Sequence, residues 1–419
     1  MLECTRRLFQ SRENRVTHGL RRWAILTQSR FIRRSHTRLM IVGMPRRSKV
    51  AVIGGGILGL AHAYAAARRG HSVVLCERGR AATGASIRNF GMIWPIGQPA
   101  GEMHHLALRS RQIWLEVLEA ARLPYLPSGS LHVAYHDDEA EVLREFAQIA
   151  PPNGYCCEWL DASRAIQRSQ AIQPRGLKGA LWSATELTVD PRLVIARFPD
   201  YLSELGVSVN FSNAVTHIDL PWVETGGGSY EADVAIICSG DDFETLFPAV
   251  FQTSGLARCK LQMMRTAPQP AGWQLGPALA AGLTLRFYKA FQMCKTLAKL
   301  KQRVAQEKPE YEKYLIHVLV SQTADGAITL GDSHEYGPCA DIFDKAEIDE
   351  LILREAETFL QLPDFRVVER WHGFYSLHSE KPFFEAEPAA GVHIVTAPGG
   401  SGMTLSFGLA ERTMQGLGL

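Results

Sequence analysis

Residues 50–79 read VAVIGGGILGLAHAYAAARRGHSVVLCERG, and the periodicity of this stretch indicates a strand, a turn, a helix and a second strand. Lys49–Ile53 is a short apolar run, typical of a buried parallel strand, and three consecutive glycines interrupt it. Over residues 57–69 apolar and small side chains recur at helical spacing, and Gly70 ends the helix. The β-branched run Ser72–Cys76 supplies the second strand.

The glycines of the turn follow the pattern G-x-G-x-x-G at Gly54, Gly56 and Gly59. In this pattern one glycine permits a tight turn, one lets backbone approach a pyrophosphate, and one permits close packing of helix on strand. Glu77 ends the second strand, where a carboxylate accepts hydrogen bonds from ribose hydroxyls, and Arg78 beside it keeps a 2′-phosphate as an alternative. An ordinary βα turn is the other interpretation, but strand, helix and acid in register favour dinucleotide binding.

The chain has 419 residues, of which 46% are hydrophobic and 21% charged, as expected of a globular protein with two cores. It contains no apolar segment of about 20 residues, so the sequence predicts no membrane span. The net charge of +2 hides an asymmetry, because residues 1–47 hold twelve arginines and only two acidic residues. The remainder is therefore acidic, which does not indicate nucleic-acid binding.

The Arg-rich leader has several interpretations. An organellar transit peptide or a nucleic-acid arm has this composition. A disordered tail, or an unused start upstream of Met44, is the simpler interpretation, so residues 1–47 are left out of the fold prediction.

The cysteines show no C-x-x-C spacing, and no secretory signal peptide precedes them. Reduced thiols and a cytoplasmic location are therefore expected. A redox pair at Cys156 and Cys157 is the less favoured alternative, because vicinal disulfides are strained.

Two later segments, residues 179–219 with a strand into Val215 and residues 232–243, are expected to return to the first sheet. Residues 83–95 form a loop of small side chains, which indicates that a flat ligand passes close to the backbone. Residues 232–243 contain an apolar strand that ends at Ser239 and Gly240. Residues 391–413 read as a strand, a glycine-rich turn and a helix, again presenting backbone N–H groups at a helix N-terminus.

Residues 284–292 and 314–337 alternate at period two, and Asp325-Gly326 is a hairpin signal, so these segments predict an antiparallel sheet. The predicted fold class is α/β, with a Rossmann-like dinucleotide-binding domain and an inserted substrate domain on an antiparallel or mixed sheet. The dinucleotide-binding domain is assigned residues 48–130, 187–258 and 363–419, and the substrate domain residues 131–186 and 259–362.

Five motifs occur in order: GGGILGL at 54–60, Glu77, GASIRNFG at 84–91, IICSG at 236–240 and GGSGMTLSFGLAE at 399–411. With these motifs the chain, from Lys49 to its end, resembles the FAD-dependent amine and amino-acid oxidoreductases of the D-amino acid oxidase superfamily, which includes glycine oxidase and monomeric sarcosine oxidase. RNFGMIWP, GDSHEYG and PGGSGMTLSFGLAE are similar to a bacterial subgroup associated with phosphonate metabolism, thought to oxidise 2-aminoethylphosphonate or its N-methyl derivative.

The resemblance implies a set of FAD-binding positions. These are Gly54, Gly55, Gly56, Ile57, Gly59, Glu77, Arg78, Ser86, Asn89, Phe90, Gly91, Val215, Ser239, Gly240, Gly399, Gly400, Ser401, Gly402, Met403 and Thr404. Sarcosine oxidases hold flavin through a cysteine shortly before the last strand, where this chain has Gly373; Cys339 lies too early. FAD is therefore expected to bind non-covalently.

An acidic group on the substrate needs charge-assisted donors, and Arg offers two in a fork. Arg286 is expected to share a strand face with Tyr288, although a surface cation paired to an acid is equally expected. The candidates for substrate binding are Arg88, Arg286, Tyr288, His334, His372 and Lys381. His317 is expected to be a buried core histidine, and no cluster in the sequence has metal-ligand spacing.

The resemblance implies oxidation of a small primary or secondary amine that bears an acidic group. Hydride passes to the flavin, the imine is hydrolysed to an aldehyde, and no protein general base is strictly required, so no catalytic residue is assigned. The alternatives are a glycine, sarcosine or D-amino acid oxidase or dehydrogenase, and a non-catalytic flavin-binding subunit or sensor. Oxygen or an electron-transfer partner is expected to reoxidise the flavin; a nucleic-acid partner is not expected.

Overall fold

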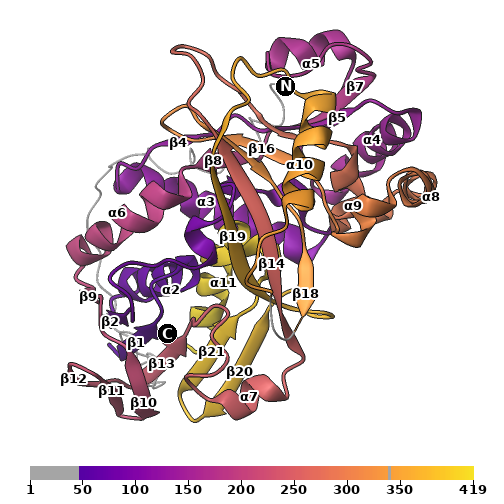
Figure 1. Cartoon of the computed structure of the whole chain (residues 1–419). Helices are drawn as coiled ribbons and strands as arrows, with labels where there is room; N and C mark the ends of the chain where they lie inside the picture. Colours follow the sequence, from indigo (N-terminus) through magenta and orange to yellow (C-terminus); the bar gives the residue numbers. More distant parts are fainter. Residues whose placement is uncertain (1–46, 338–340) are drawn as a thin grey trace, which may run out of the picture. The chain divides into compact units, whose positions relative to one another are not determined.

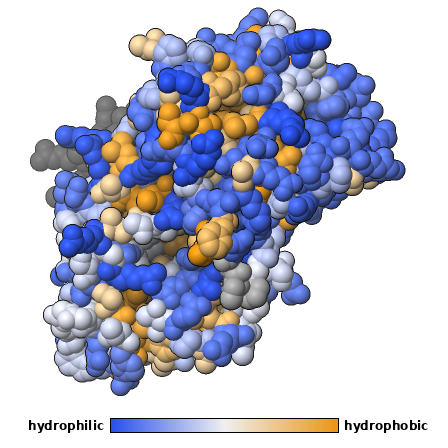
Figure 2. Space-filling view, in the orientation of Figure 1, coloured by the Kyte–Doolittle hydropathy of each residue, from blue (hydrophilic) through white to orange (hydrophobic). Residues whose placement is uncertain are grey.

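The structure is a computed structural model that describes residues 47–337 and 341–419. Residues Arg47–Leu419 form one compact unit, and residues 1–46 of the predicted leader lie outside the described residues. On the face of this unit shown in Figure 2 hydrophilic side chains predominate and apolar ones lie in separate patches. Most large apolar side chains are instead buried in three clusters.

A six-stranded sheet contains the first strand at its centre, in the order β20-β21-β13-β1-β2-β9 (Figure 1). Its members are β1 (Lys49–Ile53), β2 (Ser72–Cys76), β9 (Ser208–Asn210), β13 (Val234–Ile237), β20 (Phe384–Ala389) and β21 (Val392–Thr396). All neighbouring pairs are parallel except β20 with β21. The predicted returns to the first sheet are confirmed for residues 232–243 through β13 and for residues 208–210 through β9, whereas the strand that begins at Val215 belongs to a three-stranded sheet. The strand predicted within residues 391–413 also joins the first sheet, as β21.

Both faces of this sheet are covered, as its continuous apolar strands require. Along β1, Val50 and Val52 join one cluster with the four helices α2 (Ile57–Arg68), α3 (Glu102–Ala120), α6 (Pro191–Glu204) and α11 (Gly402–Gly416). Ala51 and Ile53 point the other way and join the cluster of a three-stranded sheet and α7 (Pro248–Gln252). That small sheet consists of β10 (Val215–Asp219), β11 (Trp222–Thr225) and β12 (Gly228–Glu231).

A nine-stranded mixed sheet forms the second layer, and the long antiparallel pair β14 (Leu256–Thr266) and β19 (Val367–His378) runs through it (Figure 1). The other strands are β5 (Ser130–Ala134), β6 (Cys157–Leu160), β7 (Gly179–Ser183), β15 (Ala278–Ala280), β16 (Leu319–Gln322), β17 (Ile328–Gly331) and β18 (Glu335–Gly337). The accompanying helices are α4 (Asp137–Ile149), α5 (Ala162–Arg168), α8 (Leu297–Glu307), α9 (Pro309–Lys313) and α10 (Ala346–Phe359).

Short elements complete the fold. A second three-stranded sheet holds β3 (Met92–Ile93), β8 (Leu187–Val189) and β4 (Tyr125–Leu126). The 3₁₀ turns are η1 (Ala85–Ile87), η2 (Pro95–Gly97), η3 (Pro151–Asn153), η4 (Gly282–Arg286), η5 (Lys289–Met293) and η6 (Gly399–Ser401). Within residues 47–337 and 341–419, no helix combines the length and the hydropathy that a membrane span needs.

The predicted α/β class with a sheet-rich second part is confirmed, and so is the hairpin at Asp325-Gly326, which joins β16 to β17. The predicted strand at residues 284–292 is wrong, since this segment forms η4 and η5. Local bonds explain the difference: Thr284 N–H and hydroxyl both donate to the Ala281 carbonyl, so the backbone needs no partner strand. The predicted domain boundaries remain a prediction.

Candidate active site

At two positions of the first turn a backbone carbonyl oxygen lies so close that only glycine fits. Gly54 has φ +108°, and a Cβ atom there would lie 2.4 Å from the carbonyl oxygen of Cys238, the residue after the neighbouring strand β13. A Cβ atom at Gly59 would lie 1.8 Å from the Gly54 carbonyl oxygen. Both positions therefore exclude any side chain, and the N-terminus of α2 is held directly beside the end of β1.

The end of β2 supplies an acid to the same turn. The Glu77 carboxylate accepts hydrogen bonds from the Gly55 N–H (2.7 Å) and the Gly79 N–H (2.8 Å). The N-cap of α2, Gly56, has no side chain to cap the helix, although the Ser86 hydroxyl accepts a bond from the Ile57 N–H (2.9 Å). The first turn of α2 thus keeps backbone donors for an anion.

A groove of about 220 Å³ runs from this turn across the ends of the parallel strands. Gly54, Gly56 and Glu77 line it on one side, and Val215 and Gly240 line it from β10 and the end of β13. Its wall also contains Arg78, whose guanidinium pairs with the Asp242 carboxylate (2.5 Å) while most of the side chain is exposed.

A larger cavity of about 520 Å³ continues from the groove, since several residues line both. The shared residues are Ile57, Ala85, Ser86, Phe374, Tyr375, Pro398, Gly399 and Gly402. Strand β14 contributes Leu261 and Met263 to the cavity wall, β19 contributes Gly373, and the loop after β19 contributes Lys381. The six-stranded and nine-stranded sheets therefore enclose one continuous space.

Sixteen of the twenty predicted cofactor positions line this space. They are Gly54, Gly56, Ile57, Glu77, Arg78, Ser86, Asn89, Phe90, Val215, Ser239, Gly240, Gly399, Gly400, Ser401, Gly402 and Met403. The other four support the walls. Gly55 and Gly59 act within the first turn, a Cβ atom at Gly91 would lie 1.9 Å from the Val189 carbonyl oxygen, and the Thr404 hydroxyl accepts a bond from the Trp94 N–H.

Four of the six predicted substrate-binding residues line the larger cavity: Arg88, Tyr288, His334 and Lys381. Arg88 donates one hydrogen bond to the His372 carbonyl oxygen (2.9 Å). Burial raises the pKa of the Tyr288 phenol, so this side chain stays a neutral hydrogen-bond donor.

Arg286 and His372 do not line that cavity. The Arg286 guanidinium is buried and donates to the Glu312 carboxylate (2.7 Å) and the Ile316 carbonyl oxygen (2.8 Å). His372 lies 2.9 Å from the Asp344 carboxylate and borders a separate cavity. Neither residue is therefore proposed to bind the substrate.

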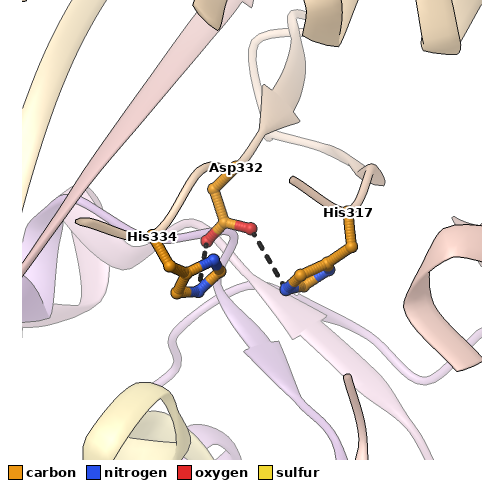
Figure 3. A group of neighbouring side chains, drawn as sticks. All are labelled: His317, Asp332 and His334. Atoms are coloured by element: carbon orange, nitrogen blue, oxygen red, sulfur yellow. Dashed lines mark ion pairs between the residues drawn. The ribbon is translucent and has the colours of Figure 1, made fainter. Parts of the chain in front are cut away.

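Sequence reasoning did not predict that two histidines and one aspartate lie together in the cavity wall. His317, which was expected to be a core residue, lines the cavity together with Asp332 and His334 (Figure 3). His317 precedes β16, and the other two follow β17. Counting outward from the Asp325-Gly326 turn would have brought residue 317 opposite residues 332–334, which is the signal that sequence reasoning left unused.

Burial controls the charge of these three groups. It raises the pKa of Asp332 to about 8 and lowers the pKa of His334 to about 4. It also holds the pKa of His317 well below its usual range, where the Arg286 charge acts in the same direction. At neutral pH both imidazoles are therefore neutral, and the carboxyl of the free protein carries a proton.

The sequence model of the family "FAD dependent oxidoreductase" (DAO) matches residues 49–415. The chain belongs to this family. The chain is similar to the glycine oxidase of Geobacillus kaustophilus, with 25% identity over 213 residues, which are 47% of this chain and 55% of that protein. Human mitochondrial sarcosine dehydrogenase is 25% identical over 211 residues, 47% of this chain and 23% of that protein. The chain thus spans about half or less of the length of these relatives.

Two solved enzyme structures have folds similar to that of this chain. The crystal structure of the G. kaustophilus glycine oxidase has a TM-score of 0.70 at 19% identity, covering 89% of this chain and 94% of that chain. L-Proline dehydrogenase from P. horikoshii has a TM-score of 0.68 at 20% identity, with the same coverage.

The residues of the groove fit FAD, the cofactor of the family. The N-terminus of α2, whose N-cap Gly56 has no side chain, offers N–H groups to a diphosphate, and Gly54 and Gly56 line the groove beside it. Glu77 keeps unused lone pairs for ribose hydroxyls. The volume beyond Ser86 leaves room for the ring system and a substrate together.

Proposed function

We propose that this chain oxidises a small primary or secondary amine that bears an acidic group, with FAD as the hydride acceptor. The observation that carries the proposal is the cavity itself, which continues the FAD groove. Its wall contains the cationic side chains Arg88 and Lys381 and the buried cluster of His317, Asp332 and His334. When bound, FAD supplies the two-electron oxidation of a C–H bond next to nitrogen. The protein's residues have to bind, orient and desolvate the amine.

Arg88 is the proposed anchor for the acidic group. It lines the cavity beside Gly373, where a Cβ atom would lie 3.3 Å from the Arg88 Cβ atom, and only one of its N–H donors is used by the His372 carbonyl. Its fork matches two oxygens of a carboxylate or phosphonate. Lys381 lines the same cavity and offers a second cation, and the neutral Tyr288 phenol adds a donor.

We propose an aminophosphonate, 2-aminoethylphosphonate or its N-methyl derivative, as the substrate. The resemblance of three motifs to the phosphonate-associated subgroup supports this choice, and so do the two cations, because a phosphonate dianion requires more donors than a carboxylate. Glycine, sarcosine or another amino acid is the second candidate, which the names of the relatives favour. We also propose that the twenty positions implied by the resemblance bind FAD.

A non-catalytic role has one observation in its favour. The mouse mitochondrial pyruvate dehydrogenase phosphatase regulatory subunit is 24% identical over 234 residues, 54% of this chain and 26% of that protein. Its name denotes a regulatory subunit. Oxidation of an amine by the FAD-loaded chain separates the two roles.

The test is anaerobic reduction of the FAD-loaded chain by each amine, followed by flavin absorbance. We expect 2-aminoethylphosphonate or its N-methyl form to bleach the flavin and yield phosphonoacetaldehyde, with glycine and sarcosine far slower. Each buried donor left unpaired by the smaller carboxylate costs about 1–3 kcal/mol. Equal rates with glycine would contradict the phosphonate assignment, and no reduction by any amine would favour the non-catalytic role.

Substitution of the anchor sharpens this test. Arg88→Ala should raise the KM or Kd for the aminophosphonate by about tenfold or more, the effect expected of a lost charge-assisted pair. Lys299→Ala is the matched control, because that lysine is exposed and pairs with Glu141 outside the cavity wall. An unchanged affinity in Arg88→Ala would remove Arg88 from the site. Reoxidation with oxygen or with an artificial acceptor would then identify the electron acceptor.

A further inference from the structure

Three side chains converge on the larger cavity from a single hairpin. His317 and Asp332 pair through their backbones, since each N–H donates to the carbonyl oxygen of the other (3.2 and 2.8 Å). The His334 N–H donates to the Tyr314 carbonyl oxygen (2.8 Å). Side chains two residues apart lie on the same side of an extended chain, so Asp332 and His334 both face His317 (Figure 3).

The geometry leaves room between the side chains. The His317 Nε2 atom lies 3.5 Å from one Asp332 carboxylate oxygen, and the His334 Nε2 atom lies 3.9 Å from the other. The imidazole rings are nearly parallel, with centroids 5.1 Å apart. These distances exceed those of good hydrogen bonds, so the carboxylate and imidazoles do not satisfy one another.

All three side chains are more than nine-tenths buried, yet polar atoms in them have no hydrogen-bond partner. These atoms are both ring nitrogens of His317 and one carboxylate oxygen of Asp332. The His334 Nδ1 atom lies 3.2 Å from the Leu315 carbonyl oxygen, which fixes its N–H there and leaves a lone pair on Nε2. Buried polar atoms normally have partners, so the cluster is built to receive a donor from the cavity.

The charge of the cluster selects a cation. Both imidazoles are neutral at pH 7, so the cluster carries no positive charge in the free protein and becomes negative once Asp332 loses its proton. Such a group attracts an ammonium and repels a phosphonate, so His334 is not suited to the anion-anchoring role predicted from sequence. The other titratable or charged groups near the cluster are Cys259, Arg286, Tyr288, Tyr336 and Tyr375, and Glu312 already pairs with Arg286.

We propose that His317, Asp332 and His334 form the amine subsite of the cavity, in which their acceptor atoms bind the N–H groups of a substrate ammonium and Asp332 takes up its proton. The inference rests on the proposed function. When the ammonium binds, the Asp332 carboxyl first releases its own proton to solvent. An N–H bond of R–NH₃⁺ then breaks and an O–H bond forms on the Asp332 carboxylate, giving R–NH₂ and a neutral carboxylic acid. The nitrogen lone pair is thereby freed for oxidation of the adjacent carbon.

A divalent metal ion is the alternative ligand, because two histidines and one aspartate are also metal-ligating types. The His317 ring argues against it. Metal-bound histidines donate their second ring N–H to an acceptor, and neither ring nitrogen of His317 has such a partner. An ammonium that moves a proton needs no fixed tautomer at this position.

The experiment measures binding of methylammonium chloride to the FAD-loaded chain by the change in flavin absorbance, with tetramethylammonium chloride as a cation that lacks N–H groups. A pH indicator in weakly buffered solution records protons released at pH 7. We expect methylammonium to bind and release about one proton, because the cation displaces the proton of Asp332. Tetramethylammonium should bind at least about tenfold more weakly.

Asp332→Asn and His317→Gln should each weaken methylammonium binding about tenfold or more, and Asp332→Asn should abolish proton release. Asp344→Asn is the matched control, since this acid pairs with His372 outside the cavity wall, and it should bind as the wild-type chain does. FAD content and thermal melting establish that each variant is folded. Asp332→Glu should restore part of the proton release.

Unchanged methylammonium binding in both cluster variants would overturn the proposal. About one equivalent of bound metal in the purified chain, lost in Asp332→Asn, would replace it with a metal site. If methylammonium binds as expected but no amine reduces the flavin, the amine subsite stands and only the proposed function fails.

Discussion

At the scale of single residues, burial and pairing decide which side chains act as charges in the cavity. His334 is present as a neutral imidazole because burial lowers its pKa to about 4. Arg286 keeps its charge, but its guanidinium donates hydrogen bonds to the Glu312 carboxylate and the Ile316 carbonyl oxygen. Arg88, by contrast, lines the cavity, and among the described residues its hydrogen bond to the His372 carbonyl oxygen uses one of its donors. Residue type alone did not separate these three candidates.

The pKa of Asp332 predicts a pH-dependent stability. Burial raises this pKa to about 8 in the folded chain, whereas an unfolded aspartate titrates at about 3.9. Between those values the folded state holds a proton that the unfolded state has lost, so the free energy of unfolding falls as pH rises. Asp332→Asn removes this dependence, and its melting temperature relative to wild type should therefore be about 2 °C or more higher at pH 8 than at pH 5.

Thermal unfolding followed by circular dichroism at both pH values checks this. Asp364→Asn is the control, because Asp364 forms a surface pair with Arg366 that lowers its pKa, so its titration lies below this window. Its difference from wild type should not change between pH 5 and pH 8. A difference for Asp332→Asn that is equally constant would show that the carboxyl is ionised throughout.

Gly373 predicts how the flavin is held. It pairs with Leu261 between β19 and β14 and lines the cavity at about the position where sarcosine oxidases have their flavin-linking cysteine. Among the described residues, no cysteine lines the 520 Å³ cavity. Acid precipitation of the FAD-loaded chain should therefore leave the yellow colour in the supernatant. Colour that stays with the precipitated protein would demonstrate a covalent bond through another side chain.

At the scale of elements, the contact between β1 and α2 positions the cofactor groove. The strand alternates its side chains between two apolar clusters, and the helix begins at once after a turn that no side chain enters. Helix α11 packs on α2 and brings the glycine turn of η6 to the other wall of the same space. The groove is therefore a property of paired elements whose ends meet.

Gly59→Ala tests this arrangement. Its Cβ atom would lie 1.8 Å from the Gly54 carbonyl oxygen, so α2 has to move away from β1. We expect at least about tenfold weaker FAD binding and a lower melting temperature, since overpacking of this kind costs about 1–3 kcal/mol. Gly416→Ala is the control: a Cβ atom there meets nothing within 4 Å, and FAD affinity should stay at the wild-type value. Equal FAD affinity in both variants would contradict the tight contact.

At the scale of the whole molecule, Arg47–Leu419 is one compact unit in which both sheets wall the groove and the cavity. Strand β14 and strand β19 pair along their length, although the predicted boundaries assign β19 to the FAD-binding domain and most of β14 to the substrate domain. This long pair couples the two layers.

The compact unit predicts that the leader is dispensable for FAD binding. A chain that starts at Met44 should fold, take up one equivalent of FAD and melt within about 2 °C of the full chain, because the groove and the cavity lie within Arg47–Leu419. Flavin content and thermal melting of both chains measure this. Loss of FAD on truncation would show that residues before Met44 contribute to the fold.

By itself the sequence determined the features that depend on neighbouring residues: the strand, glycine turn and helix at the start, the acid at Glu77, the Asp325-Gly326 hairpin and the α/β class. Periodicity and turn chemistry depend on a few neighbouring residues, so they can be recognised in the sequence without knowledge of the fold. Only the tertiary structure decided that the buried His317 faces Asp332, that Arg286 is neutralised by Glu312, and that residues 284–292 need no partner strand. Those outcomes depend on burial and on contacts between distant segments, which change the charge and hydrogen bonding of a side chain without changing its identity.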